Sequence, residues 1–156
     1  MNVRPAEPDD LDALARLWFE VWTASHAPMM PEALIKLRTL ESFHERLAHM
    51  IDDVRVIGPL GAPIGFCAIK DDELYQMFVS AAAQGTGAAA VLMADGEARL
   101  KTNGVRTTWL SCAIGNDRAA RFYEKLGWRR IGPLPIEVET SAGPFTLESC
   151  RYEKDL

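Results

Sequence analysis

Apolar residues recur at helical spacing twice in the first third of the chain, over residues 11–22 and again over residues 34–51. Residues 5–10, with two prolines and three acidic residues, supply a turn and a helix start before the first of these stretches. Prolines bracket a break at residues 28–31. Since residues 2–4 suit a short strand, this part of the chain predicts one strand followed by two helices.

From residue 54 the pattern changes to that of short strands. Residues 54–58 and 64–70 predict a hairpin around the turn PLGAP, and residues 73–79 predict a third strand after a turn of two aspartates. A helix is predicted from about residue 87 to residue 100. One face of this helix carries small and apolar residues at helical spacing: Ala89, Leu92, Met93, Gly96 and Leu100. Because glycine disfavours a helix, we expect close packing of Gly96 against a sheet.

The last third of the chain predicts one more helix and three strands. Residues 107–114 form a strand, after which Asn116 caps a helix that Gly127 ends. Residues 128–131 and 145–152 form two last strands, joined by a proline-rich loop. This order of elements predicts an α/β fold with a mixed sheet (α+β). The sheet is mostly antiparallel, with one parallel strand–helix–strand crossover and about four flanking helices.

Length and composition fit one compact domain over residues 1–156. The apolar fraction of 48% and the charged fraction of 25% are those of an ordinary globular protein. No apolar run approaches the roughly 20 residues that span a bilayer, and the first residues lack the apolar core of a secretory signal. We therefore expect a cytoplasmic protein without a membrane partner. The net charge is −5 and no Lys/Arg cluster is present, so no nucleic-acid partner is expected.

Three cysteines stand far apart in apolar stretches: Cys67, Cys112 and Cys150. None belongs to a C-x-x-C pair, so neither a metal site nor a disulfide framework is predicted. Burial as small hydrophobic residues in strands is the expected role of all three.

The stretch QGTGAAA, residues 84–90, fits two kinds of phosphate-binding loop. Gly85, Gly87 and Ala90 match the dinucleotide pattern G-x-G-x-x-G/A, which would indicate an oxidoreductase. Gln84, Gly87 and Ala89 match the pattern Q/R-x-x-G-x-G/A of a loop that binds coenzyme A. In both cases small residues before a helix expose backbone N–H groups to an anion.

The surroundings of the loop disfavour the dinucleotide interpretation. That interpretation requires an acidic residue about 20 positions further on, to hold the ribose. Residues 107–112 reach this position and contain no acid. Only one further strand–helix unit follows, so a nicotinamide oxidoreductase is set aside.

Two segments and the start of the chain match a single family. The stretch LYQMFVSAAAQGTGAAAVLM resembles the strand, pyrophosphate loop and helix of the GNAT superfamily of acyl-CoA-dependent N-acyltransferases. NDRAARFYEKLGW resembles that family's N-x-x-A-x-x-F-Y-x-x-x-G-F/W segment, and VRPAEPDDL is similar to its usual start. The resemblance implies a GNAT-like fold that transfers an acetyl group from acetyl-CoA to a primary amine, by direct attack in a ternary complex. The acceptor would be a small-molecule or peptide amine, and a homodimer is compatible with the resemblance.

The resemblance also implies catalytic roles. The backbone N–H of Val79 takes the position of the oxyanion donor, and Tyr123 takes the position of the acid that protonates the departing thiolate. Glu73 lies where some relatives carry a base that acts through water, although it equally fits a solvated turn residue. Asn116 resembles an asparagine that contacts the pantetheine chain, and it equally fits a helix N-cap.

Binding residues follow from the same resemblance. The loop contains no Lys or Arg, so its backbone N–H groups are expected to hold the pyrophosphate of acetyl-CoA, without a metal. The implied contacts to this co-substrate are Phe78, Val79, Gln84, Gly85, Thr86, Gly87, Ala88, Ala89, Ala90, Asn116, Ala119 and Tyr123. The loop after the first helix is expected to form a moderately apolar acceptor pocket from Trp22, His26, Met29 and Met30. A non-catalytic acyl-CoA-binding or sensor domain of the same fold is the alternative.

Overall fold

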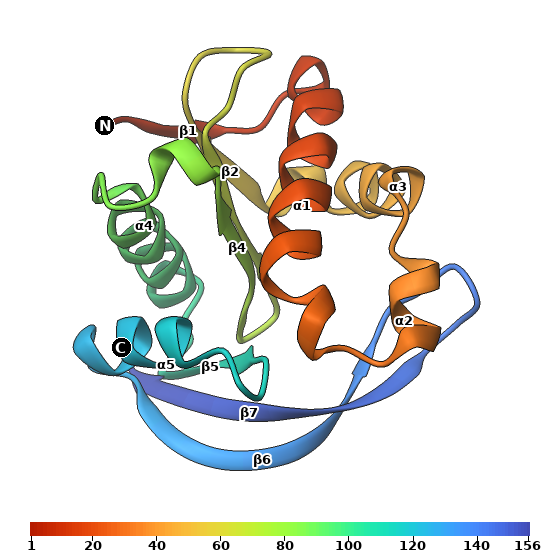
Figure 1. Cartoon of the computed structure of the whole chain (residues 1–156). Coiled ribbons are helices and arrows are strands. Elements are labelled where there is room, and N and C mark those ends of the chain that lie inside the picture. The colour runs from red at the N-terminus through yellow and green to blue at the C-terminus, as the bar shows by residue number, and fades with distance from the viewer.

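The computed structural model describes residues 1–156, which form a seven-stranded sheet and five α-helices (Figure 1). The strands are β1 (Val3–Pro5), β2 (Val54–Ile57), β3 (Gly65–Lys70), β4 (Glu73–Val79), β5 (Thr107–Cys112), β6 (Arg129–Val138) and β7 (Phe145–Asp155). The helices are α1 (Leu11–Ser25), α2 (Glu32–Leu37), α3 (Leu40–Met50), α4 (Ala88–Thr102) and α5 (Asp117–Lys125). None of the helices has the length and apolar character needed to span a bilayer.

The strand order is β1-β2-β3-β4-β5-β7-β6, and every neighbouring pair is antiparallel except β4 and β5. Helix α4 connects that parallel pair, so the predicted mixed sheet with a single parallel crossover is confirmed. Helices α1 and α3 lie on one side of the sheet, and α4 and α5 lie on the other (Figure 1).

Each face of the sheet has its own hydrophobic core. Trp18 and Phe43 pack with Phe66 under α1 and α3, while Leu92 of α4 packs with Cys67 on the opposite face. The close packing expected of the helical glycine is confirmed, because a Cβ on Gly96 would lie 2.9 Å from the Cys67 Sγ. All three cysteines are buried and free, as the sequence predicted.

The predicted helix over residues 34–51 is divided in the structure. Arg38 has ψ 69°, outside the helical range, and Thr39 starts α3 by accepting a hydrogen bond of 3.1 Å from the Ser42 N–H. The apolar spacing runs on across this break, so periodicity alone does not reveal it. Local capping chemistry therefore makes five helices where about four were expected.

Strand β6 is longer than the predicted strand over residues 128–131. It runs to Val138 and contains both Pro133 and Pro135, for which a loop is predicted from the sequence. Proline is tolerated there because β6 is the edge strand of the sheet, whose outer side needs no N–H donors. The resulting β6–β7 hairpin extends to α2 (Figure 1), where Arg38 donates a hydrogen bond to the backbone carbonyl of Glu139.

Strands β4 and β5 separate soon after they begin. Their only register pair is Glu73 with Trp109, and β4 contains a bulge at Tyr75, which has no partner in β3. From there to Val79 the edge of β4 that faces β5 is not covered by a neighbouring strand. This gap opens the sheet at its centre and positions the site described next.

Candidate functional site

Two cavities meet at the gap between β4 and β5. The loop cavity has a volume of about 480 Å³ and extends from the loop of residues 83–90 to α5. The hairpin cavity has a volume of about 370 Å³ and lies between α1, β4 and the β6–β7 hairpin. Six residues line both: His26, Tyr75, Gln76, Phe78, Ser111 and Ala113. The two cavities therefore adjoin along the middle of β4.

The loop of residues 84–90 presents unpaired backbone N–H groups at the start of α4. Gly85 and Gly87 have φ values of 78° and 89°, which glycine adopts without strain. No acceptor within the chain takes the N–H groups of four residues here: Gly85, Gly87, Ala89 and Ala90. Together with the positive end of a 15-residue helix, these groups form a site suited to an anion.

Two residues assigned to this loop do not line the cavity. The Thr86 hydroxyl turns back to donate to the Ala83 carbonyl, and the Ala88 side chain is fully buried in the core. The Ala88 N–H is 3.4 Å from the Thr86 hydroxyl oxygen and so is not free for a ligand. Their sequence neighbours carry the exposed N–H groups instead.

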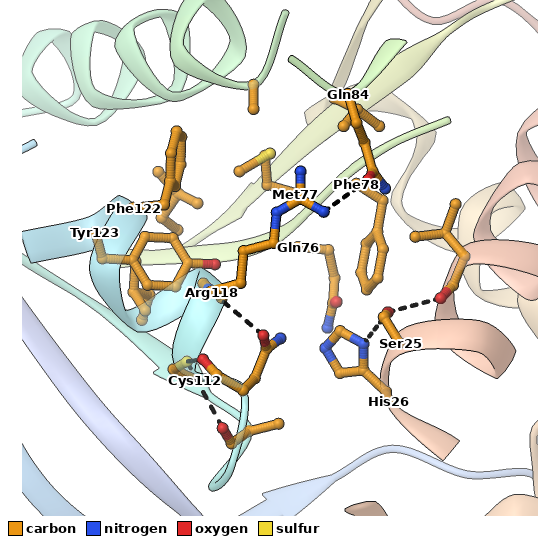
Figure 2. Close-up of a pocket in the computed structure, with 18 of the residues that line it drawn as sticks. Ser25, His26, Gln76, Met77, Phe78, Gln84, Cys112, Arg118, Phe122 and Tyr123 are labelled. Carbon is orange, nitrogen blue, oxygen red and sulfur yellow. Dashed lines mark hydrogen bonds between the residues drawn. The ribbon is translucent and has the colours of Figure 1, made fainter. Parts of the chain in front are cut away.

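A basic side chain that the sequence analysis missed lies beside the loop. Arg118, in the first turn of α5, donates a hydrogen bond of 2.9 Å to the side-chain oxygen of Gln84 (Figure 2). Arg118 also lines the loop cavity. The loop itself holds no Lys or Arg, but the fold brings one to it from 34 residues further along the chain.

Backbone direction places the N–H and C=O groups of alternate residues on the open edge of β4. The Ser80 N–H donates to the Ile64 carbonyl at 2.8 Å, toward the β3 side of the strand. Because successive N–H groups along a strand point to opposite edges, those of Val79 and Met77 point into the gap toward β5. The N–H of Val79, the predicted oxyanion donor, is therefore directed into the gap, and so is the N–H of Met77.

Tyr123 projects its hydroxyl into the loop cavity (Figure 2). Its ring packs against Trp128 and Tyr152, with centroids 6.5 and 5.9 Å away. Hydrogen bonds within the chain involve the hydroxyls of Tyr75 and Tyr152 but not that of Tyr123, and burial raises the pKa of Tyr123 above its ordinary value. The phenol therefore keeps its proton at neutral pH, available to a group in the cavity.

Asn116 serves as the predicted N-cap of α5, because its side-chain oxygen accepts a hydrogen bond of 3.2 Å from the Ala119 N–H. Both residues also line the loop cavity. The cap leaves the amide nitrogen of Asn116 without an assigned partner, so the same side chain can hold the helix and still face a ligand.

Glu73 lines the hairpin cavity and not the loop cavity. Burial raises its pKa to about 7, and the charge of Lys70 opposes this rise. The carboxyl group is therefore able to exchange protons near neutral pH. Along the strand, Glu73 is six residues from Val79 but four from Met77, distances of about 20 and 13 Å at the rise of a β-strand.

The hydrogen bonds of Ser25 determine the tautomer of His26. The Ser25 hydroxyl donates its one hydrogen to the Val21 carbonyl at 2.6 Å. The His26 Nδ1, 2.7 Å from the Ser25 oxygen, must therefore carry the hydrogen that it donates to Ser25. Burial lowers the pKa of His26 to about 4, which keeps the ring neutral. Its Nε2 is then a hydrogen-bond acceptor where the two cavities meet, on the side of the ring facing Gln76 (Figure 2).

Two of the three remaining predicted acceptor residues line the hairpin cavity. Trp22 and Met30 line the hairpin cavity, as expected for a moderately apolar pocket. Met29 lines neither cavity, because it packs against Gly115, where a Cβ would lie 3.3 Å from the Met29 sulfur.

Comparison with known proteins agrees with this geometry. The family model of the acetyltransferase (GNAT) family matches residues 11–128, so the chain belongs to that family, and the predicted resemblance is confirmed. A comparison with curated proteins gives no match. Family membership supports acetyl transfer as the general activity.

Solved structures of similar fold cover nearly the whole chain. PaiA N-acetyltransferase from Thermoplasma acidophilum, in complex with coenzyme A, has a TM-score of 0.75 at 20% identity, covering 99% of this chain and 98% of that one. Ribosomal-protein-alanine N-acetyltransferase from Brucella melitensis has a TM-score of 0.75 at 20% identity, with both chains fully covered. YncA of Salmonella typhimurium, solved with its cofactor acetyl-CoA, has a TM-score of 0.73 at 16% identity, covering 99% of this chain and 93% of that one.

Proposed function

We propose that this protein transfers the acetyl group of acetyl-CoA to a primary amine by direct attack within a ternary complex. The observation that carries the proposal is the gap between β4 and β5. This gap joins an anion-binding loop to a second cavity lined by a titratable carboxyl group. A reaction between two bound substrates needs two adjoining compartments of this kind.

The loop cavity suits acetyl-CoA. Its pyrophosphate would take the free N–H groups of residues 85–90 and the guanidinium of Arg118. The pantetheine chain would follow the open edge of β4, so that the thioester carbonyl meets the N–H groups of Met77 and Val79. PaiA and YncA, which share the fold, are described in complex with coenzyme A and acetyl-CoA.

The chemistry then needs only groups that border the two cavities. A neutral amine attacks the thioester carbon, a C–N bond forms, and the oxygen takes up negative charge facing the β4 donors. The C–S bond breaks and the sulfur receives the proton of Tyr123. Glu73, with a pKa of about 7, accepts the proton that the ammonium form must lose, through water across the distance to the gap. As the intermediate collapses, the attacking nitrogen loses its second proton to water, and water passes a proton on to the phenolate of Tyr123.

The cysteine thiol that lines the loop cavity is poorly suited to form a covalent acyl-enzyme. Cys112 lines the loop cavity, but burial raises its pKa to about 12. Since the thiolate is the nucleophile, this thiol is unreactive at neutral pH. Direct attack by the amine needs no such group.

Neutral His26 is suited to orient the amine. Its Nε2 can accept one N–H of the incoming amine and so direct the nitrogen lone pair toward the carbonyl. At a pKa of about 4 the ring does not compete with Glu73 for the proton.

Thiol release from acetyl-CoA across a panel of amines tests the proposal. Release that depends on the amine, with equimolar N-acetyl product, is the expected result. Saturable binding of acetyl-CoA without release for any amine would instead favour a non-catalytic acyl-CoA-binding domain. The position of Glu73 outside the loop cavity is the observation on which that alternative rests.

A further inference from the structure

Two arginines face the hairpin cavity without a carboxylate partner. Arg38, between α2 and α3, is only 6% exposed, and Arg46 projects from α3. No carboxylate oxygen lies within 4 Å of either guanidinium. Two positive charges therefore share one cavity. Burial lowers the pKa of Arg38, and the charge of Arg46 lowers it further.

Elsewhere in the chain, buried and half-buried basic side chains are paired with carboxylates. Every other buried or half-buried Arg and Lys has an ion pair: Arg4 with Asp10, Arg55 and Arg99 with Asp95, Arg151 with Glu153, and Lys154 with Glu97. An uncompensated charge away from water is costly. The exception at Arg38 and Arg46 thus indicates a position where the compensating anion is not part of the chain.

The existing contacts of the two arginines leave donors free. Arg38 donates to the backbone carbonyl of Glu139. Arg46 lies 4.4 Å above the centre of the Trp18 ring and donates to the Tyr75 hydroxyl at 3.2 Å. The Nε of Arg46 is buried with no partner. Each guanidinium carries five N–H donors, so most of the ten have no acceptor in the chain.

The carboxyl groups of the same cavity do not fill this role. The charge of Glu139 is felt by Arg38 and Arg46, but its carboxylate pairs with Lys70 at 3.0 Å and with neither arginine. Glu137 is exposed on the edge strand. Glu73 lies at the start of β4 with a raised pKa, so at neutral pH it is only partly charged. The wall between these groups and the gap is largely apolar, formed by Trp22, Met30, Leu34, Phe78, Ile136 and Leu147.

We propose that the acceptor is an amine that carries a carboxylate, which Arg38 and Arg46 bind while the amine reaches the gap between β4 and β5. This proposal rests on the proposed acetyl transfer and specifies its substrate class. Tyr75, which Arg46 contacts, lies two residues before Met77 and four before Val79. The carboxylate and the amine are thus separated by about 7–13 Å along the strand, with an apolar body between them.

Matched acceptor pairs test the proposal. The pairs are 4-(aminomethyl)benzoate with 4-(aminomethyl)benzamide, and 6-aminohexanoate with 6-aminohexanamide, which differ in the carboxylate alone. We expect kcat/KM to favour the carboxylate by about 10- to 100-fold, the value of one or two charge-assisted hydrogen bonds. Equal rates within both pairs, from an enzyme that acetylates amines, would overturn the proposal and leave the proposed function intact.

Substitutions test whether the two arginines cause the preference for acceptors that carry a carboxylate. Arg46→Gln and Arg38→Gln should each reduce the ratio of carboxylate to carboxamide toward one, whereas Arg16→Gln, on the exposed face of α1, should preserve it. Since Arg38 also holds the hairpin, Arg38→Lys keeps the charge there and should retain part of the preference. A ratio unchanged in Arg46→Gln would contradict the assignment.

A binding measurement separates this proposal from the acetyl transfer itself. Trp18, Trp22 and Trp109 line the hairpin cavity, so their fluorescence reports its occupancy without turnover. If no amine is acetylated, a saturable fluorescence change with 6-aminohexanoate that Arg46→Gln abolishes still supports the anion site. No saturable change in the wild type would overturn it.

Discussion

Replacement of Glu73 by glutamine tests whether this residue is the base. Burial raises the pKa of Glu73 to about 7, so its carboxylate fraction rises from about 1% at pH 5 to about 90% at pH 8. If the carboxylate takes the amine's proton, kcat/KM of the wild type contains a factor that climbs roughly 100-fold over this range. Glu73→Gln should lower kcat/KM about 100-fold or more at pH 8 and remove that factor.

The acceptor's own ionisation contributes equally to both proteins, so the ratio of the two pH profiles isolates Glu73. Asp71→Asn is the matched control, because Asp71 lies in the same turn, is exposed, and makes only a small contribution to the raised pKa of Glu73. Asparagine also tolerates the φ of 52° found there. A constant ratio of wild type to Glu73→Gln across pH 5–8 would refute the assignment.

Stability gives a second readout of the same group. A folded-state pKa of about 7 against 4.5 in the unfolded chain means that Glu73 stabilises the fold fully below pH 4.5, and that this contribution is lost as pH rises through 7. Urea unfolding should therefore show Glu73→Gln gaining stability relative to the wild type between pH 4 and pH 8. A relative loss over that range would show that the carboxyl group is not desolvated.

Four further substitutions probe the rest of the site and the packing of α4. Tyr123→Phe should lower kcat by about 100-fold or more with little change in stability, because no group in the chain bonds the hydroxyl; an unchanged kcat would exclude Tyr123 as the acid. Arg118→Gln should weaken coenzyme A binding by up to about fivefold, as expected for an exposed charge, whereas Thr86→Ala should leave the calorimetric Kd nearly unchanged; the reverse order would contradict the backbone-based loop. Gly96→Ala should destabilise the fold by about 1–2 kcal/mol, because overpacking against Cys67 outweighs the gain in helix propensity; a higher urea midpoint would contradict this.

The sequence predicted the parts of the fold that depend on local pattern. The strand of residues 73–79, the cap at Asn116 and the small-residue face around Gly96 all follow from spacing and from the conformational demands of single residues. The break at Arg38 and the long strand β6 were missed for a physical reason. Prolines are tolerated in β6 because it is an edge strand. The cap at Thr39 interrupts the helix without disturbing the apolar spacing along the sequence.

The site was less predictable because it is assembled from distant segments. Arg118 reaches the loop only through the packing of α5, and the state of His26 depends on a hydrogen bond that Ser25 makes with the previous helical turn. The arginine pair in the hairpin cavity depends on the helix break and on the long hairpin, both of which the periodicity concealed. The sequence therefore predicted the backbone loop, whereas the positions of the charged side chains became apparent only in the folded structure.

Rapid mixing with acetyl-CoA, in the presence and in the absence of an amine, tests the central claim most directly. Direct transfer predicts no thiol release and no acetylated protein without an amine, and equimolar thiol and N-acetylamine when an acceptor is added. A burst of thiol before any amine is present, with the acetyl group on the protein, would contradict direct attack between the two cavities.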